Sequence, residues 1–79
     1  MPTAEQHLEM AREFILAQPD LDTCARHLTI QHHLKAAGIE FKKYLQGGLG
    51  SKINAVYSVV HGGEESQVKT IPQLLEFLR

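Results

Sequence analysis

The apolar pattern of this chain changes phase once near its middle, and that change limits the possible folds more than any other feature. Two stripes at helical spacing follow one another there, namely Leu21, Cys24, Ala25 and Leu28, and then Ile30, Leu34 and Ala37. The two-residue step from Leu28 to Ile30 turns about 200° around a helix axis. One straight helix therefore cannot bury both stripes. We expect two short helices that meet at an angle near Thr29, with Asp20 or Asp22 capping the first.

A capping box predicts a helix at the start of the chain. Thr3 and Gln6 have the spacing at which each side chain bonds the backbone amide of the other residue. Apolar residues then recur at helical spacing until Pro19, which forces the preceding residue out of helical angles. We therefore expect a first helix over residues 4–17.

A second capping signal predicts a helix at the end of the sequence. Thr70 and Gln73 repeat the box, with Pro72 in the first turn, where a missing amide hydrogen costs nothing. One apolar stripe follows the same spacing, formed by Ile71, Leu74, Leu75 and Leu78. This pattern predicts a short closing helix that packs onto the rest of the domain.

Gly38 is the predicted end of the second of the two central helices. In a Schellman ending, glycine adopts a positive φ and the next residue, here Ile39, folds back toward Leu34. Residues 40–46 are then expected to form one or two further helical turns. In those turns the predicted inward residues are Phe41, Tyr44 and Leu45, and the predicted outward residues are Lys42 and Lys43. Three glycines, Gly47, Gly48 and Gly50, are expected to end the helical part of the chain.

The chemistry changes from helix to strand after these glycines. The run 53–60 is rich in β-branched residues, and Gly62 and Gly63 supply a turn before the polar run 67–70. We favour a β-hairpin. The alternative is a helix, because Ile53, Val56, Tyr57 and Val60 also fit helical spacing.

Together these elements predict an α+β fold that is mainly α, in one domain over residues 1–79. Its N-terminal two-thirds are expected to be helix-turn-helix-like, followed by a small β-hairpin and a closing C-terminal helix, as in a winged helix. A domain of this size buries only about 60–65% of the surface that its unfolded chain exposes. A homodimer or a docked partner is therefore a natural source of further buried area.

Composition indicates the compartment. The single cysteine excludes an internal disulfide, and no apolar run approaches the roughly 18 residues that cross a bilayer. The acidic, amphipathic start differs from a secretory signal, which is basic and then uniformly apolar. We therefore expect a cytoplasmic protein with no membrane partner.

Charge is segregated along the chain although the total is close to neutral. Residues 1–22 hold five acidic residues and one arginine, whereas residues 23–63 hold five basic residues and one glutamate. Four of the five histidines also lie in this basic middle, which gains positive charge as the pH falls toward 6. A polarised surface of this kind indicates a charged partner.

The basic middle and the order of elements favour a DNA-binding transcriptional regulator of the winged helix-turn-helix type. Residues 31–35 would form the recognition helix, where glutamine bridges adenine edges and lysine or protonated histidine attracts phosphate. The candidate binding residues are Arg26, Gln31, His32, His33, Lys35, Lys42 and Lys43. Because one chain offers few phosphate contacts, we expect a homodimer.

The alternative is a protein-interaction module, such as a small inhibitor or adaptor, that places the same basic face on an acidic surface of a partner protein. The pI of about 6.5 agrees with this alternative, since DNA-binding domains typically exceed about 9. Phe41 and Tyr44 would then be apolar anchors.

Residues 25–28 and 33–45 resemble the second half of an AraC-type DNA-binding unit. In such a unit the recognition helix ends in glycine, here Gly38, followed by an aromatic residue and a Tyr-Leu pair. The resemblance implies DNA binding. This chain is several residues shorter between the two segments and lacks the arginines usual there, so the sequence does not assign it to the family.

No catalytic or cofactor motif stands out, and we expect a non-enzymatic protein with neither metal nor cofactor. Cys24 and His27 lie one helical turn apart, with His32 and His33 nearby, but a lone cysteine in an apolar stripe is usually a core residue. The run 47–52 lacks the spacing of a phosphate-binding loop and follows a predicted helix, which favours a connector.

Overall fold

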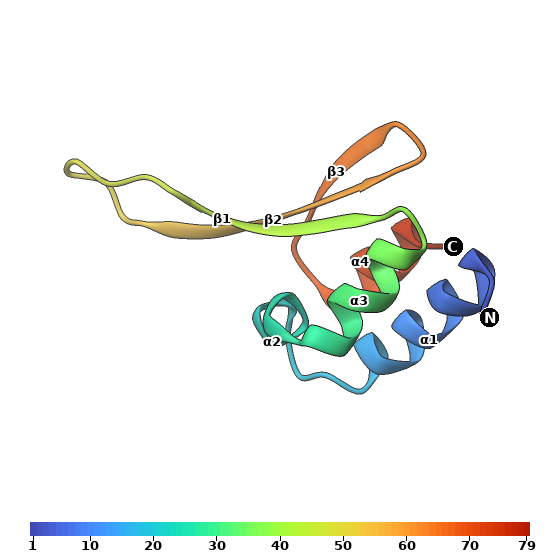
Figure 1. Ribbon diagram of the computed structural model, residues 1–79. Helices are drawn as coiled ribbons and strands as arrows, with labels where there is room; N and C mark the ends of the chain where they lie inside the picture. The colour runs from blue at the N-terminus through green and yellow to red at the C-terminus, as the bar shows by residue number, and fades with distance from the viewer.

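The computed structural model describes residues 1–79 as four helices and a three-stranded antiparallel sheet (Figure 1). In chain order the elements are α1 (Ala4–Leu16), α2 (Leu21–Arg26), α3 (Leu28–Ala36), β1 (Glu40–Gln46), β2 (Asn54–His61), β3 (Glu64–Val68) and α4 (Ile71–Phe77). The predicted α+β class, with a β-hairpin and a closing C-terminal helix, is confirmed. None of the four helices has both the length and the apolar character needed to cross a bilayer.

The capping residues predicted from the sequence begin three of the helices. At α1, the backbone amide of Gln6 donates to Thr3 Oγ1 at 3.1 Å and the amide of Thr3 donates to Gln6 Oε1 at 2.8 Å, so the box is complete. Asp20 rather than Asp22 caps α2. Thr70 caps α4, preceded by β3 and a short link.

The chain bends between α2 and α3, as the phase change predicts. The bend lies at His27, two residues before the expected position, and this one residue is the C-cap of α2 and the N-cap of α3. Its Nδ1 accepts from the backbone amide of Ile30 at 3.3 Å. A junction of one residue is tighter than the turn of about three or four residues that joins a typical helix-turn-helix pair.

Gly38 ends α3 in the predicted Schellman motif. The amide of Ile39 donates to the Leu34 carbonyl at 2.9 Å and the amide of Gly38 donates to the Lys35 carbonyl at 3.0 Å. Gly38 has a φ of +77°, which residues with a side chain rarely adopt.

Residues 40–46 form strand β1, so the helical turns expected there are wrong. Phe41 is buried as predicted, but Tyr44 and Leu45 are exposed. The apolar spacing of these residues fits a helix, whereas the backbone pairs along its whole length with β2, from Glu40 opposite Val60 to Gln46 opposite Asn54. Pairing with a β-branched strand supplies backbone hydrogen bonds that local spacing does not reveal.

The predicted hairpin is the β2–β3 pair, and the helical alternative for residues 53–60 is wrong. β2 is the central strand and pairs with β3 from Tyr57 opposite Val68 to His61 opposite Glu64. The helices lie on one side of the sheet (Figure 1). The apolar core between them consists of Ala11, Ile15, Leu21, Cys24, Ile30, Leu34, Ile39, Phe41, Val59, Val68, Leu74 and Leu78.

The far half of the β1–β2 ribbon projects out of this body, and we call residues 44–55 the β-arm (Figure 1). β3 pairs with β2 only from Tyr57 onward, so the β-arm has two strands and no third. Every residue of the β-arm except Gly48 is exposed. The molecule accordingly measures 49 × 27 × 20 Å along its principal axes.

Candidate nucleic-acid interface

Helix α3 presents one exposed face. Ile30 and Leu34 point into the core, and the opposite side of the helix carries Leu28, Thr29, His32 and Lys35, all exposed. Leu28 is 84% exposed although leucine favours the interior, so the N-terminal end of this face is apolar.

A groove of about 650 Å³ separates this face from strand β1. His32 and Lys35 line it from α3, and Lys42 lines it from β1. Gln31 also lines the groove, so four of the seven residues predicted to bind a partner lie on one concave surface. Lys42 also pairs with Glu40, and this contact raises the pKa of the lysine.

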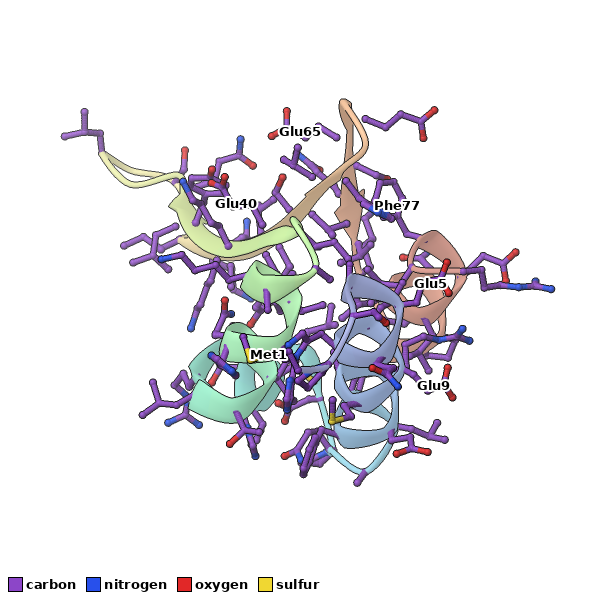
Figure 2. The ribbon with its side chains drawn as sticks, turned by 45° about the vertical axis from the view of Figure 1, so that its right-hand side comes forward. Met1, Glu5, Glu9, Glu40, Glu65 and Phe77 are labelled. Carbon is purple, nitrogen blue, oxygen red and sulfur yellow. The ribbon has the colours of Figure 1, made fainter.

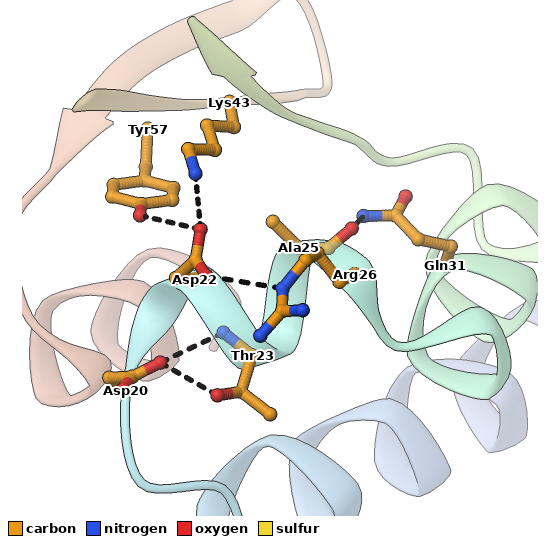
Figure 3. A network of polar contacts seen from close by, with 8 residues as sticks. All are labelled: Asp20, Asp22, Thr23, Ala25, Arg26, Gln31, Lys43 and Tyr57. Atoms are coloured by element: carbon orange, nitrogen blue, oxygen red, sulfur yellow. Dashed lines mark hydrogen bonds and ion pairs between the residues drawn. The ribbon is translucent and has the colours of Figure 1, made fainter.

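Asp22 connects helix α2 to the base of the β-arm (Figure 3). Its Oδ1 accepts from Lys43 Nζ of β1, and more distantly from the Tyr57 hydroxyl of β2 at 3.4 Å. Its Oδ2 pairs with Arg26 Nε at 3.1 Å. Two more of the predicted binding residues, Arg26 and Lys43, thus share one carboxylate.

The ionisation of this network follows from its contacts. The hydrogen bond from Lys43 lowers the pKa of Asp22, and the same bond raises the pKa of Lys43. Desolvation raises the pKa of Tyr57, and the nearby charge of Asp22 adds to that effect. At neutral pH the carboxylate is ionised and Tyr57 is a neutral donor.

Gln31 was expected to point away from the core, and the structure places it differently. It is half-buried, and its Nε2 donates to the backbone carbonyls of Ala25 at 3.2 Å and Phe41 at 3.3 Å. Its amide nitrogen therefore ties α3 to α2 and β1 rather than facing solvent (Figure 3 shows the Ala25 bond).

His33 is also turned inward. It is half-buried, its Nδ1 lies 2.9 Å from Nδ1 of His7 in α1, and its ring stacks near that of Phe14. Desolvation lowers the pKa of His33, as do the neighbouring charges of His32 and His7. Among the seven predicted residues, only His32 and Lys35 have neither a hydrogen bond nor an ion pair through the side chain.

Sequence reasoning missed three residues that belong to the exposed surface around α3 and the β-arm. Leu28 and Thr29 were assigned to the core stripe and to the bend, although they begin the exposed face of α3. Lys52 lies in the connection between β1 and β2, at the end of the β-arm, and has no ion pair. No spacing rule signals it, because its position depends on the β1 strand that was expected to be a helix.

The residues of the cysteine–histidine and glycine motifs considered in the sequence have structural roles. Cys24 is fully buried, and burial raises the pKa of its thiol. His27 caps α3. Residues 47–52 connect β1 to β2, which agrees with the predicted connector and not with a phosphate-binding loop, since no helix follows them.

Two acidic residues of α1, Glu5 and Glu9, lie on another side of the molecule. Figure 2 shows Glu5 and Glu9 pointing from α1 away from α2 and α3. The segregation of charge along the sequence is therefore kept in space for these two residues of α1, whereas Asp22 pairs with Arg26 and Lys43 of the basic segment.

Comparisons with known protein families, with curated proteins and with solved structures find no match for this chain. The AraC-type resemblance thus has no family match behind it, and residues 40–45 of the resembling segment form a strand. The fold and the surface define a small α+β domain in which two angled helices carry an exposed polar face beside a projecting β-arm.

Proposed function

We propose that this protein binds duplex DNA, with the exposed face of α3 in the major groove and the β-arm along the neighbouring backbone. The observation that carries the proposal is the position of the β-arm, which leaves the body on the side of α2 and projects beyond it (Figure 1). A helix of nine residues with one exposed face fits the major groove, which is about 12 Å wide. A transcriptional regulator of winged-helix type combines a helix and a ribbon in this way.

The residues of the α3 face have suitable chemistry for a groove. Lys35 and His32 are free to contact phosphate or guanine acceptors, and the side chain of Leu28 matches the methyl group of thymine. Gln31 is not assigned a base contact, because its amide nitrogen is already bonded to two carbonyls.

The end of the β-arm supports the same proposal. Lys52 places a cation there, and Leu49 is fully exposed at the same end. Proteins that use ribbons on DNA combine cations on the backbone with apolar side chains that wedge between base steps. Both kinds of residue are present at the end of this ribbon.

The cations that form ion pairs within the protein remain available to the phosphate backbone of DNA. The pairs of Lys42, Lys43 and Arg26 involve side chains at least 35% exposed, and ion pairs that are this exposed contribute little to stability. Phosphate groups compete for these cations at little cost. Together with Lys35 and Lys52 they give five cations for one chain, a small number that favours binding as a homodimer.

A protein partner is the second candidate, and one observation favours it. Leu45 and Ile53 on the β-arm are 72% and 61% exposed, and Leu49 adds a third apolar side chain at its end. Apolar groups gathered on a projecting ribbon are typical of surfaces that bind proteins. An inhibitor or adaptor would use them as anchors for an acidic partner.

Fluorescence anisotropy with a labelled random-sequence duplex tests the first candidate. The double variant Lys35→Ala, Lys52→Ala should bind at least about tenfold more weakly, and it should reduce the slope of log K against log salt by about two. The charge-matched control is Lys69→Ala, Arg79→Ala, which alters cations on either side of α4. Equal losses in both variants, or no binding at low salt, would reject DNA as the partner.

A further inference from the structure

Three histidine rings from two helices meet at one place. His7 comes from α1, and His32 and His33 come from α3. One ligand nitrogen from each ring lies within 4.8 Å of the other two. The ring centroids are 5.1, 5.2 and 5.8 Å apart, so the rings form an almost equilateral triangle.

This triangle has nearly the size of a zinc site. Three imidazoles bound tetrahedrally at the usual Zn–N distance have ligand atoms about 3.3 Å apart and ring centroids about 5 Å apart. The centroids already satisfy this spacing. The nitrogens need to approach by at most about 1.5 Å, which side-chain rotation supplies because His32 is exposed and free to turn.

The only side-chain hydrogen bond of the three rings joins His7 to His33. No hydrogen bond or ion pair joins any of them to a carboxylate. Nδ1 of His7 and Nδ1 of His33 lie 2.9 Å apart, at hydrogen-bond distance, so one ring donates its N–H to the other. For a metal ion to bind both Nδ1 atoms, the donor ring moves this proton to its Nε2, and both rings then coordinate as neutral imidazoles.

We propose that His7, His32 and His33 bind one divalent transition-metal ion, preferably zinc, that links α1 to α3 and keeps a fourth coordination position open. Three neutral imidazoles suit zinc, copper and nickel and do not suit magnesium or calcium, which require oxygen ligands. The open position would hold water or a ligand from a partner. His32 also belongs to the exposed face of α3 that we propose binds DNA, but the test of the metal site does not involve DNA.

The sequence gives a partial signal for this site. His32 and His33 were noticed, but they were combined with Cys24 and His27, which the fold uses in the core and as a cap. His7 is separated from His32 by the whole of α2, so only the packing of α1 against α3 reveals the third ligand.

Calorimetric titration with zinc chloride tests the proposal on protein purified without a histidine tag and freed of metal by a chelator. We expect one zinc ion per chain with a micromolar Kd, and a melting temperature raised by about 10 °C at a hundredfold excess of zinc over Kd. Magnesium chloride should give no heat of binding.

His7→Gln and His32→Gln should each weaken zinc binding by about tenfold or more, because each removes one of three ligands. His61→Gln on β2 is the matched control and should bind like the unmodified protein. Because His32 is exposed, we expect His32→Gln to remain folded. If His7→Gln does not fold, His32→Gln alone tests the proposal. Absence of zinc binding below about millimolar concentration, or an equal loss in His61→Gln, would overturn the proposal.

Discussion

The central strand β2 belongs to two regions of opposite character. Toward its C-terminal end, Val59 is fully buried in the core that the sheet shares with the helices. At the other end, Asn54 and Ala55 are exposed and pair only with β1. A two-stranded ribbon is at best marginally stable by itself in water. The difference indicates that the body supplies stability, whereas the β-arm depends on the body and is free to contact a partner.

The largest expected effect lies in the body. Leu34→Ala removes a fully buried side chain from α3 and should lower the free energy of unfolding by about 2–5 kcal/mol in a urea titration. Leu28→Ala is the matched control on the same helix and should cost less than about 0.5 kcal/mol. Equal costs at the two positions would remove the distinction between core and exposed face.

The next effect lies at the base of the turn that closes the β-arm. Gly47 has a φ of +106°, and a Cβ atom there would lie 2.3 Å from the Lys52 carbonyl oxygen. Gly47→Ala should destabilise the closed turn by about 1–3 kcal/mol and shift the amide resonances of the β-arm but not those of α1. Gly48→Ala meets no atom within 4 Å and should disturb the β-arm less, although its φ is also positive. Changes spread through α1 would contradict the independence of the two regions.

A smaller effect is expected where the two regions meet, at Asp22. Lys43 lowers the pKa of this carboxyl in the folded state, so the folded state binds a proton less readily than the unfolded state. The resulting stability is present above the ordinary pKa of about 4 and is lost as the pH falls through the lower, folded value. Asp22→Asn should therefore be less stable at pH 7 and should lose less stability on acidification, measured by urea titrations between pH 7 and 2.

Glu64→Gln is the control for this pH dependence, because Glu64 is exposed and has no ion pair. It should keep the acid sensitivity of the unmodified protein. An Asp22→Asn variant with unchanged acid sensitivity would show that the network at the base of the β-arm does not contribute to the pH dependence of stability.

The smallest effect is expected within the β-arm. Leu45→Ala should change the free energy of unfolding by less than about 0.5 kcal/mol, since the side chain is 72% exposed. Guanidinium titration of both proteins measures the difference. A cost above about 2 kcal/mol would show that Leu45 is buried, in the body or in a dimer.

The sequence predicted the elements that local chemistry determines. The Thr3 box, the cap at Asp20 or Asp22, the bend near Thr29 and the Gly38 ending all follow from contacts within a few residues along the chain. Residues 40–46 could not be predicted in the same way, because Phe41, Tyr44 and Leu45 fit helical spacing. Their state is decided by pairing with β2, across a connection that local spacing does not describe.

The candidate site was predictable to a smaller extent, because its geometry depends on contacts between elements. Lys35 and His32 are exposed as expected from their positions opposite the apolar stripe. Gln31 and His33 are held by backbone carbonyls and by His7, and neither contact is visible in the spacing of residues on one helix. Lys52 became a candidate only when its segment proved to be the end of the β-arm.

The most direct test of the account shortens the β-arm and measures both stability and DNA binding. Replacing residues 45–55 by Asn-Gly closes the ribbon at the paired positions Tyr44 and Val56 with a two-residue turn. We predict that the shortened protein keeps its melting temperature within a few degrees and binds the duplex at least about tenfold more weakly. Undiminished DNA binding by the shortened protein, or loss of its fold, would contradict the division between a stable body and a binding β-arm.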